Sequence, residues 1–188
     1  MDKNQLKQKF RKFILKSCTH KPNNYKKDKI IVNKLIKYIE NKNIKNLMIY
    51  IPLKSEVNVL PLIEYFRKKK VNIYVPFMQG KSFILVKYRL PLGIKKFKIK
   101  EPGFSRFKIK DIDLAIVPIL GIDITNRRVG FGKGMYDRFY ANKKIKIKET
   151  IFIQRDLYIC KEIITQKHDI TSNFIATSSI KLINAKDL

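Results

Sequence analysis

The chain has 188 residues, 45% of them hydrophobic and 11% aromatic, which suits one packed domain and is too short to suggest two. Its apolar runs, such as residues 47–53 and 114–121, are too short to cross a bilayer, and the Lys-rich N-terminus lacks the apolar stretch of a signal peptide. Cys18 and Cys160 are too few for a disulfide framework or a zinc site. We therefore expect a cytoplasmic protein with no membrane partner.

Charge is the most unusual property of the sequence: 42 Lys and Arg stand against 15 Asp and Glu, a formal net charge of +27. Residues 1–45 carry 14 basic and 3 acidic side chains, and residues 81–110 carry 10 and 1. Such an excess is typical of proteins that bind polyanions. A genome rich in A and T produces the same composition, because the codons for Lys, Ile, Asn, Tyr and Phe are rich in those bases. We favour this compositional explanation, so charge alone does not determine the function.

Helical and extended patterns alternate along the chain without an internal repeat. Leu6, Phe10, Phe13 and Ile14 recur at helical spacing and predict an amphipathic first helix. In chain order we expect helices over residues 3–16 and 25–41, a strand over 46–51, a helix over 61–68, and strands over 71–75 and 82–88. A basic connection over residues 89–110, a strand over 113–117, a helix near 137–142 and a strand over 150–153 complete the prediction.

Strands separated by helices predict an α/β fold, a single domain over residues 1–188 with a largely parallel sheet flanked by helices on both faces. Pro76 is expected to end the strand over residues 71–75, and Pro118 the strand over 113–117. The order of the strands cannot be predicted from the sequence. Ligands of such sheets bind at the carboxyl ends of the strands, which directs attention to the segment after residue 117.

That segment combines features that suit an anionic ligand. Three glycines occupy every second position: Gly130, Gly132 and Gly134. They let the backbone approach a ligand and adopt positive φ, and successive amides in such a loop can bind an anion. Lys133 adds a mobile positive charge, Arg128 a planar fork of donors, and Asp137 an oxygen ligand suited to Mg²⁺. Glycine-rich turns are common and this one is neither a P-loop nor a dinucleotide fingerprint, so a nucleotide site and a plain turn stay open.

The run Arg128–Arg138, Arg-Val-Gly-Phe-Gly-Lys-Gly-Met-Tyr-Asp-Arg, closely resembles the signature of the 5-formyltetrahydrofolate cyclo-ligases. Shorter pieces of the family pattern occur in the same order along nearly the whole chain: Lys3-x-x-Leu6-Lys7, Leu53-Lys54-Ser55-Glu56 before Pro61-Leu62-Ile63, Lys100-Glu101-Pro102, Val117-Pro118, Gly121-Ile122-Asp123 and His168-Asp169-Ile170. Four positions depart from it: Lys7, Ile122, Asn126 and Met135. Asn126 replaces a glycine, and asparagine tolerates the left-handed region. Lys7 replaces an arginine, which Arg11 one turn later can supply.

The resemblance implies a ligase that forms a C–N bond, converting 5-formyltetrahydrofolate into 5,10-methenyltetrahydrofolate with release of ADP and phosphate. It implies ATP and Mg²⁺ as the cofactors and a small-molecule substrate as the partner. We expect a monomer, although the sequence does not determine the oligomeric state. The basic stretch over residues 81–110 adds the hypothesis that the substrate carries a polyglutamate tail.

The resemblance also implies which residues bind the nucleotide and the metal. The residues marked as catalytic are Lys133, Arg128 and Tyr136. The ATP-binding set is Lys3, Lys7, Arg128, Gly130, Phe131, Gly132, Lys133, Gly134, Met135, Tyr136 and Asp137. Asp137 and Asp169 look like the carboxylates that hold Mg²⁺, whereas a helix cap and a surface turn are their simpler roles. Lys3 and Lys7 fit a solvated helix face equally well.

A folate slot is the remaining element that the resemblance implies. Its residues are Ile51, Leu53, Glu56, Phe97 and Tyr136. Glu56 is expected to accept hydrogen bonds from the pterin ring, and its alternative is a carboxylate at the start of a helix. The apolar members also fit a hydrophobic core, and Tyr136 also fits simple packing.

Two other functions stay open at this point. The net charge permits a nucleic-acid-binding protein, but we find neither a recognised module nor basic residues interleaved with exposed aromatics. The departures at Lys7 and Met135 permit a family member that binds folate or nucleotide without catalysis, while Glu56, Lys133 and Asp137 speak against it.

Overall fold

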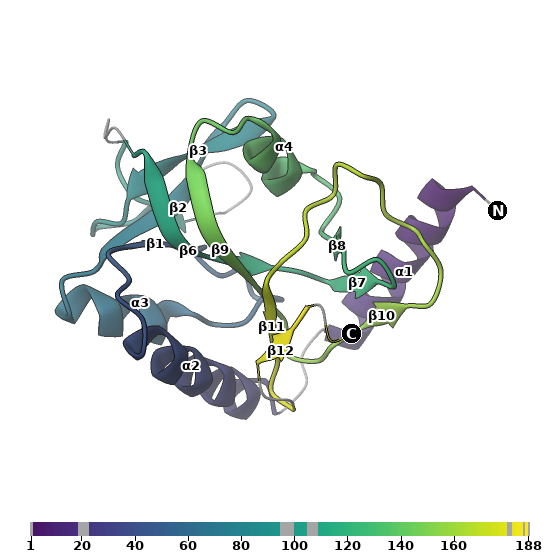
Figure 1. The fold of residues 1–188 in the computed structure, drawn as a ribbon, viewed down its shortest axis with the longest axis horizontal. Coiled ribbons are helices and arrows are strands. Elements are labelled where there is room, and N and C mark those ends of the chain that lie inside the picture. Colours follow the sequence, from purple (N-terminus) through teal and green to yellow (C-terminus); the bar gives the residue numbers. More distant parts are fainter. Residues whose placement is uncertain are drawn as a thin grey trace.

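The computed structural model describes residues 2–18, 23–94, 100–104, 109–179, 182–185 and 187. Its centre is a seven-stranded sheet (Figure 1). The strands are β1 (Asn46–Met48), β2 (Asn72–Gln79), β3 (Ser82–Lys87), β6 (Asp111–Pro118), β9 (Lys146–Ile153), β11 (Phe174–Ala176) and β12 (Ile183–Asn184), in the order β12-β11-β9-β6-β1-β2-β3. The five strands from β11 to β2 are parallel to one another, and β3 and β12 add antiparallel edges.

Helices cover both faces of this sheet, as predicted. The helices α2 (Asn24–Glu40) and α3 (Leu60–Lys68) lie against one face, and α4 (Met135–Ala141) lies against the other (Figure 1). The first helix, α1 (Lys3–Cys18), lies to one side, next to a small sheet of β7 (Gly121–Asp123), β8 (Arg128–Val129) and β10 (Ile159–Cys160). The predicted α/β class and its two covered faces are confirmed.

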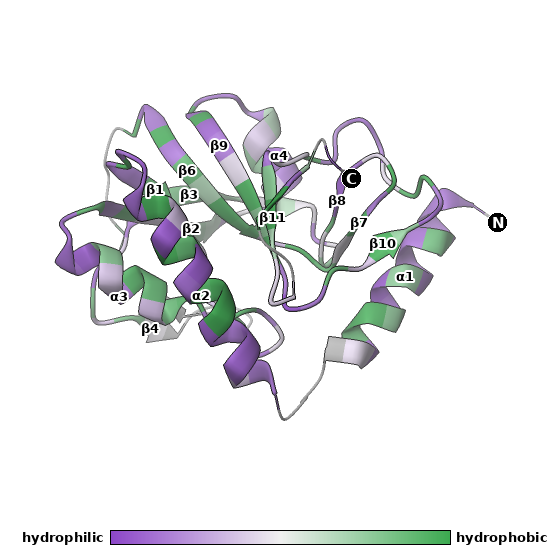
Figure 2. Cartoon of the chain, turned by 60° about the horizontal axis from the view of Figure 1, so that its bottom comes forward, coloured by the Kyte–Doolittle hydropathy of each residue, from purple (hydrophilic) through white to green (hydrophobic). Residues whose placement is uncertain are grey.

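The alternating side chains of β6 explain why both faces need a cover. Leu114 and Ile116 pack in the apolar cluster formed with α2 and α3, whereas Ala115 and Val117 pack in the cluster that Phe139 of α4 joins. A parallel strand buried on both sides has no polar face, so its residues form a continuous apolar run. Figure 2 shows the same effect along β9, which changes from hydrophilic at its start to hydrophobic at its end.

The prediction that Pro76 ends the second strand is wrong. The strand β2 continues to Gln79 and pairs Pro76 with Leu85 of β3. Its parallel pairing with β1 reaches only Tyr74, whose carbonyl oxygen accepts the amide of Ile49 at 2.9 Å. Proline has no amide hydrogen to donate, so it ends the ladder with β1 while the antiparallel ladder on the other side of β2 continues.

Several short elements were not predicted. They are β4 (Gly93–Ile94) and β5 (Lys100–Glu101), within the expected basic connection, and β7, β8, β10, β11 and β12. Each has only two or three residues, which is too few to show a period of two in the sequence. None of the helices within the described ranges combines the length and the apolar character needed to span a bilayer.

Asp123 holds the small sheet together. Its carboxylate accepts the amide and hydroxyl of Thr125 at 2.9 and 2.6 Å, and those of Thr165 at 2.9 and 2.6 Å. Burial raises the pKa of this carboxyl, but the hydrogen bonds outweigh burial and bring the pKa below its usual value. Asp123 thereby fixes β7, against which β8 pairs just before the glycine loop.

Candidate functional site

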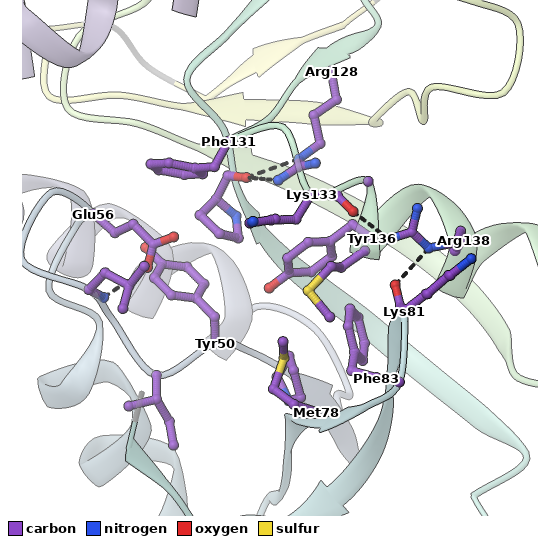
Figure 3. A pocket seen from close by; sticks show the side chains of 17 residues that line it. Tyr50, Glu56, Met78, Lys81, Phe83, Arg128, Phe131, Lys133, Tyr136 and Arg138 are labelled. Carbon is purple, nitrogen blue, oxygen red and sulfur yellow. Dashed lines mark hydrogen bonds between the residues drawn. The ribbon is translucent and has the colours of Figure 1, made fainter. Parts of the chain in front are cut away.

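A cavity of about 560 Å³ opens at the carboxyl ends of the central strands (Figure 3). Residues 50–56, which follow β1, form one wall, and Pro118 at the end of β6 contributes to the next. The hairpin of β2 and β3 and the segment over residues 128–138 close the other sides. This is the edge of an α/β sheet where ligands are expected to bind.

The glycine loop, residues 130–134, connects β8 to α4. Gly132 and Gly134 have φ values of +101° and +59°, which side-chain-bearing residues rarely adopt. Gly130 is needed for a different reason, since a Cβ atom there would lie 2.2 Å from Nη1 of Arg128. The left-handed conformation expected at Asn126 is also present, with φ of +55°.

Arg128 connects the loop to the sheet. Its Nε and Nη2 atoms donate to the carbonyl oxygen of Pro118 at 3.1 and 3.0 Å, and its guanidinium lies 4.8 Å from the ring centroid of Tyr136. Its Nη1 atom is 3.9 Å from a carboxylate oxygen of Asp137. Burial lowers the pKa of Arg128, with Asp137 and Tyr136 opposing the effect. Arg128 therefore lines the cavity as a buried cation whose orientation is fixed.

The two predicted metal ligands lie next to each other in the fold but not on the cavity wall. The amide of Ile170 donates to Asp137 at 3.3 Å, which brings Asp169 to the same place. Asp169 is buried and forms an ion pair with Lys7, whose Nζ atom is 2.5 Å away. Neither the surface turn for Asp169 nor the solvated helix face for Lys7 is therefore correct.

Arg11 belongs to this charged cluster, although it was not among the predicted site residues. Its Nε atom donates to the carbonyl oxygen of Gly130 at 2.8 Å. Burial lowers the pKa of Arg11, while Asp169 and Asp137 raise it. Arg11 lies one turn after Lys7 in α1, so the two share a face of the helix, from which Arg11 reaches Gly130 and Lys7 reaches Asp169. The four-residue spacing between Lys7 and Arg11 is the sequence feature that could have identified Arg11 as a site residue.

Three polar groups of the cavity come from different segments. Figure 3 shows Lys133 of the loop, Tyr136 of α4 and Glu56 of the turn after β1 directed toward a common space. Burial raises the pKa of Glu56 to about 7, against the lowering effects of the hydrogen bond from the Leu53 amide at 2.9 Å and of the charges on Arg128 and Arg155. Burial also raises the pKa of Tyr136 far above its ordinary value, so this phenol stays protonated.

The structure brings most predicted site residues together. Those that line the cavity are Ile51, Leu53, Glu56, Arg128, Phe131, Lys133, Gly134, Met135 and Tyr136. Those of the described chain that lie outside its wall are Lys3, Lys7, Gly130, Gly132, Asp137 and Asp169. Phe97 lies outside the described residues. Glu56 does not start a helix, because α3 begins only at Leu60.

Sequence reasoning missed the part of the cavity that the β2–β3 hairpin builds. Met78, Lys81 and Phe83 line it, and Phe83 contacts the Tyr136 ring with centroids 5.0 Å apart. Arg138 connects the hairpin to the loop, since its Nε atom donates to the carbonyl oxygen of Lys81 at 2.7 Å and its Nη2 atom to that of Lys133. These contacts join segments that are far apart in the sequence, and no local pattern signals them.

Metal binding by side chains alone is not supported. Within the described ranges, no three or more His, Cys, Asp or Glu residues are close enough together to hold an ion. Mg²⁺ does not require such a cage, because it is commonly bound by one or two carboxylates together with phosphate oxygens and water. Asp137 and Asp169 supply two carboxylates beside the glycine loop, which fits that requirement.

Comparison with known proteins gives a consistent result. The sequence model of the 5-formyltetrahydrofolate cyclo-ligase family matches residues 3–178. The 5-formyltetrahydrofolate cyclo-ligase of Mycoplasma genitalium is 30% identical over 127 residues, which are 64% of this chain and 68% of that protein. The 5,10-methenyltetrahydrofolate synthetase structure from Aquifex aeolicus matches with a TM-score of 0.79 and 26% identity, over 97% of this chain and 94% of that one. The synthetase structure from Mycoplasma pneumoniae shares the fold, with a TM-score of 0.67 and 21% identity over 94% and 98% of the two chains.

Replacing Gly130 by alanine should destabilise the protein, because the new methyl group overlaps the guanidinium of Arg128 and forces it away from Pro118. We expect a loss of about 1–3 kcal/mol in the free energy of unfolding, measured with urea. The control is Gly103→Ala, where no atom lies within 4 Å of the added Cβ and φ is not positive. Equal stability of the two variants would contradict the tight contact.

Proposed function

The chain belongs to the 5-formyltetrahydrofolate cyclo-ligase family, and we propose that it is a cytoplasmic enzyme that converts 5-formyltetrahydrofolate into 5,10-methenyltetrahydrofolate, using Mg²⁺ and ATP and releasing ADP and phosphate. Family members are ligases. One observation supports the reaction most strongly: the lysine of the glycine loop and the carboxylate of Glu56 face the same cavity. A phosphoryl donor and a pterin can therefore meet there.

The cavity has two chemically different ends. The phosphate end carries Lys133 and Arg128 beside the amides of the glycine loop. Arg11 donates to the carbonyl oxygen of Gly130 in that loop, and Lys7 pairs with Asp169. The pterin end lies between the turn with Glu56 and the apolar side chains of Ile51 and Met78. A flat heterocycle with N–H donors suits such a slot, because the carboxylate can accept them while apolar side chains cover the ring.

The reaction proceeds in two steps. The formyl oxygen on N5 of the pterin forms a bond to the γ-phosphorus as the bond from that phosphorus to ADP breaks. N10 then attacks the formyl carbon and loses its proton, and the C–O bond breaks to release phosphate. Lys133 neutralises charge on the transferring group, and this electrostatic stabilisation together with positioning accounts for most of the catalysis of phosphoryl transfer.

The remaining residues orient the reactants. Tyr136 is protonated and lies against Arg128, so its hydroxyl is a donor near the formyl group. Asp137 and Asp169 would hold Mg²⁺, which when bound neutralises the negative charge of the phosphates. Lys7 holds Asp169 in place, and Lys3, exposed at the start of α1, adds positive charge to the nucleotide side.

The activity is tested by mixing the purified protein with Mg-ATP and 5-formyltetrahydrofolate and following methenyl-folate absorbance. Lys133→Ala and Asp137→Ala should each lower kcat about 100-fold or more, because the first removes a positive charge beside the phosphates and the second removes a carboxylate that would hold Mg²⁺. The control is Lys37→Ala, which removes an exposed lysine from α2. Tight RNA binding in a filter assay without ATP turnover would favour a nucleic-acid-binding protein, and folate or ATP binding without turnover would favour a non-catalytic member.

The affinity for folate should depend on pH through Glu56. With a pKa of about 7, this carboxyl is mostly protonated at pH 6 and mostly ionised at pH 8, and only the ionised form accepts two hydrogen bonds from the pterin. We expect affinity to rise roughly tenfold between these pH values. Glu56→Gln should bind more weakly and without this rise, whereas Glu64→Gln, exposed on α3, should behave as the wild type. A pH-independent wild type would contradict the role of Glu56.

The basic stretch over residues 81–110 leads us to propose a polyglutamylated substrate. Lys81 stands on the cavity wall at the start of this stretch, and residues 95–99 and 105–108 lie outside the described part. If these charges attract the tail, raising the salt concentration should weaken binding of the polyglutamate form much more steeply than that of the monoglutamate. Isothermal titration of both forms at several salt concentrations measures this, and equal slopes reject the proposal.

A further inference from the structure

We propose that the buried ion pair between Asp28 and Arg155 sets the position of the Glu56 carboxylate, which makes both residues positioning residues for folate binding. This inference rests on the proposed function, because Glu56 is the residue assigned there to the pterin. Asp28 lies in the first turns of α2, and Arg155 follows β9. Neither residue lines the cavity, and neither belongs to the glycine loop.

The ion pair between Arg155 and Asp28 is bidentate. Nε of Arg155 donates to Oδ1 of Asp28 at 2.7 Å, and Nη2 donates to Oδ2 at 3.0 Å. Both side chains are buried, with relative exposures of 8% and 10%. A bidentate arginine–carboxylate pair of this kind has a defined orientation, unlike a single contact to a lysine.

The pair also binds the backbone around Glu56, through Nη1 and Nη2 of Arg155 and through Oδ2 of Asp28. Arg155 donates from Nη1 to the carbonyl oxygen of Ser55 at 3.0 Å and from Nη2 to that of Glu56. Asp28 accepts the amide of Asn58 at 3.1 Å through Oδ2. Three backbone groups on both sides of Val57 are thus bound by one ion pair.

The turn itself, which the structure describes throughout, has no regular secondary structure, although Val57 and Val59 pack in the core. The described chain has neither helix nor strand between β1 and α3, where residues 49–59 run. Within the turn, the amide of Glu56 donates to the carbonyl oxygen of Leu53 at 3.0 Å, and the amide of Leu53 donates to the Glu56 carboxylate at 2.9 Å. The hydroxyl of Tyr50 donates to the carbonyl oxygen of Val57 at 2.9 Å. The Leu53 amide orients the carboxylate within the turn, and contacts from α2 and from the segment after β9 fix the turn's backbone relative to the sheet, because no continuous ladder of backbone hydrogen bonds in the described chain does so.

Arg155 also acts on Glu56 through its charge. The titratable and charged groups around this carboxyl are Arg128 of β8, Arg155 with Asp28 behind it, Tyr50 after β1, Tyr136 of α4 and Lys133 of the glycine loop. The guanidinium of Arg155 lowers the pKa of Glu56, against burial, which raises it. Removing the Arg155 charge should therefore move the titration of Glu56 to higher pH, which a purely structural role would not do.

The chain contains a matched control one residue away on each side. Lys27 donates to Asp156, so a second ion pair joins the same helix to the same segment after β9. Among the described residues, this pair has no hydrogen bond to the turn over residues 53–58. Asp156→Asn and Lys27→Met thus remove a link between the same elements and leave the turn bound.

The experiment compares Asp28→Asn, Arg155→Met and Arg155→Lys with these two controls. We measure the free energy of unfolding, KM for 5-formyltetrahydrofolate, KM for ATP, kcat and the pH profile of kcat/KM. The first three variants should raise KM for the folate about tenfold, the loss expected when hydrogen bonds to a charged group are weakened, and change KM for ATP less than twofold. Arg155→Met should move the acidic limb of the profile to higher pH. Arg155→Lys keeps the charge and should leave that limb near its wild-type position.

A double-mutant cycle provides the decisive comparison. On the Glu56→Gln background, Arg155→Lys should change KM for the folate no further, because its effect passes through the carboxylate that is already neutralised. If Arg155→Met does not fold, Arg155→Lys still tests whether the orientation of the ion pair matters for KM for the folate. Two results would overturn the inference while the proposed activity stays supported. One is full additivity of the two substitutions in KM for the folate. The other is that the Asp28 and Arg155 variants behave like the Lys27 and Asp156 variants although Glu56→Gln raises KM. A wild type without cyclo-ligase activity would overturn both.

Discussion

The hydrogen bonds from Arg128 to the carbonyl oxygen of Pro118 are the interaction on which the site depends. Pro118 ends the central strand β6, whose last five residues are buried, so its carbonyl has a fixed position at the edge of the sheet. Arg128 fixes the glycine loop relative to that carbonyl, because Gly130 packs directly on the guanidinium. Tyr136 then lies against the same cation. One buried cation thereby aligns the loop and α4 with the sheet.

A chain with a formal charge of +27 has few acidic side chains, and the structure uses several of them in buried pairs. Asp28 pairs with Arg155, and Asp169 pairs with Lys7, each with little exposure. A buried ion pair contributes little net stability. Breaking it leaves an uncompensated buried charge, so the pair stays formed and holds the two segments that carry it in one arrangement. Neither pair lines the cavity, but each contacts a segment next to it: the turn with Glu56 for the first pair and the cluster of Asp137 and Asp169 for the second. The excess of lysine is mostly on the surface, where it is compatible with compositional drift and does not disturb these contacts.

The sequence was sufficient for the parts of the fold that rest on local patterns. The buried run of β6 and the apolar stripes of α2 and α3 have clear periods, and the glycine loop with Lys133 and Asp137 has a distinctive spacing. The pairing of Arg138 with the β2–β3 hairpin and the contact of Arg11 with Gly130 arise only when distant segments meet. Pro76 shows the limit of a local rule, because its effect depends on which neighbour a strand has on each side. Strand order likewise follows from packing of whole elements, not from any one of them.

The change of partner at Pro76 has a consequence for how this cavity can vary. Before that residue β2 belongs to the parallel sheet, and after it β2 belongs only to the hairpin with β3. The outer half of the hairpin, with Met78, Gly80 and Lys81 on the cavity wall, therefore has no ladder of hydrogen bonds with β1 and is attached to the rest of the fold by side-chain packing and by Arg138. Residues inserted at its tip would deepen or narrow the binding slot without shifting the register of any central strand. The size of the slot can thus change in this architecture while the pairing of the central strands stays the same.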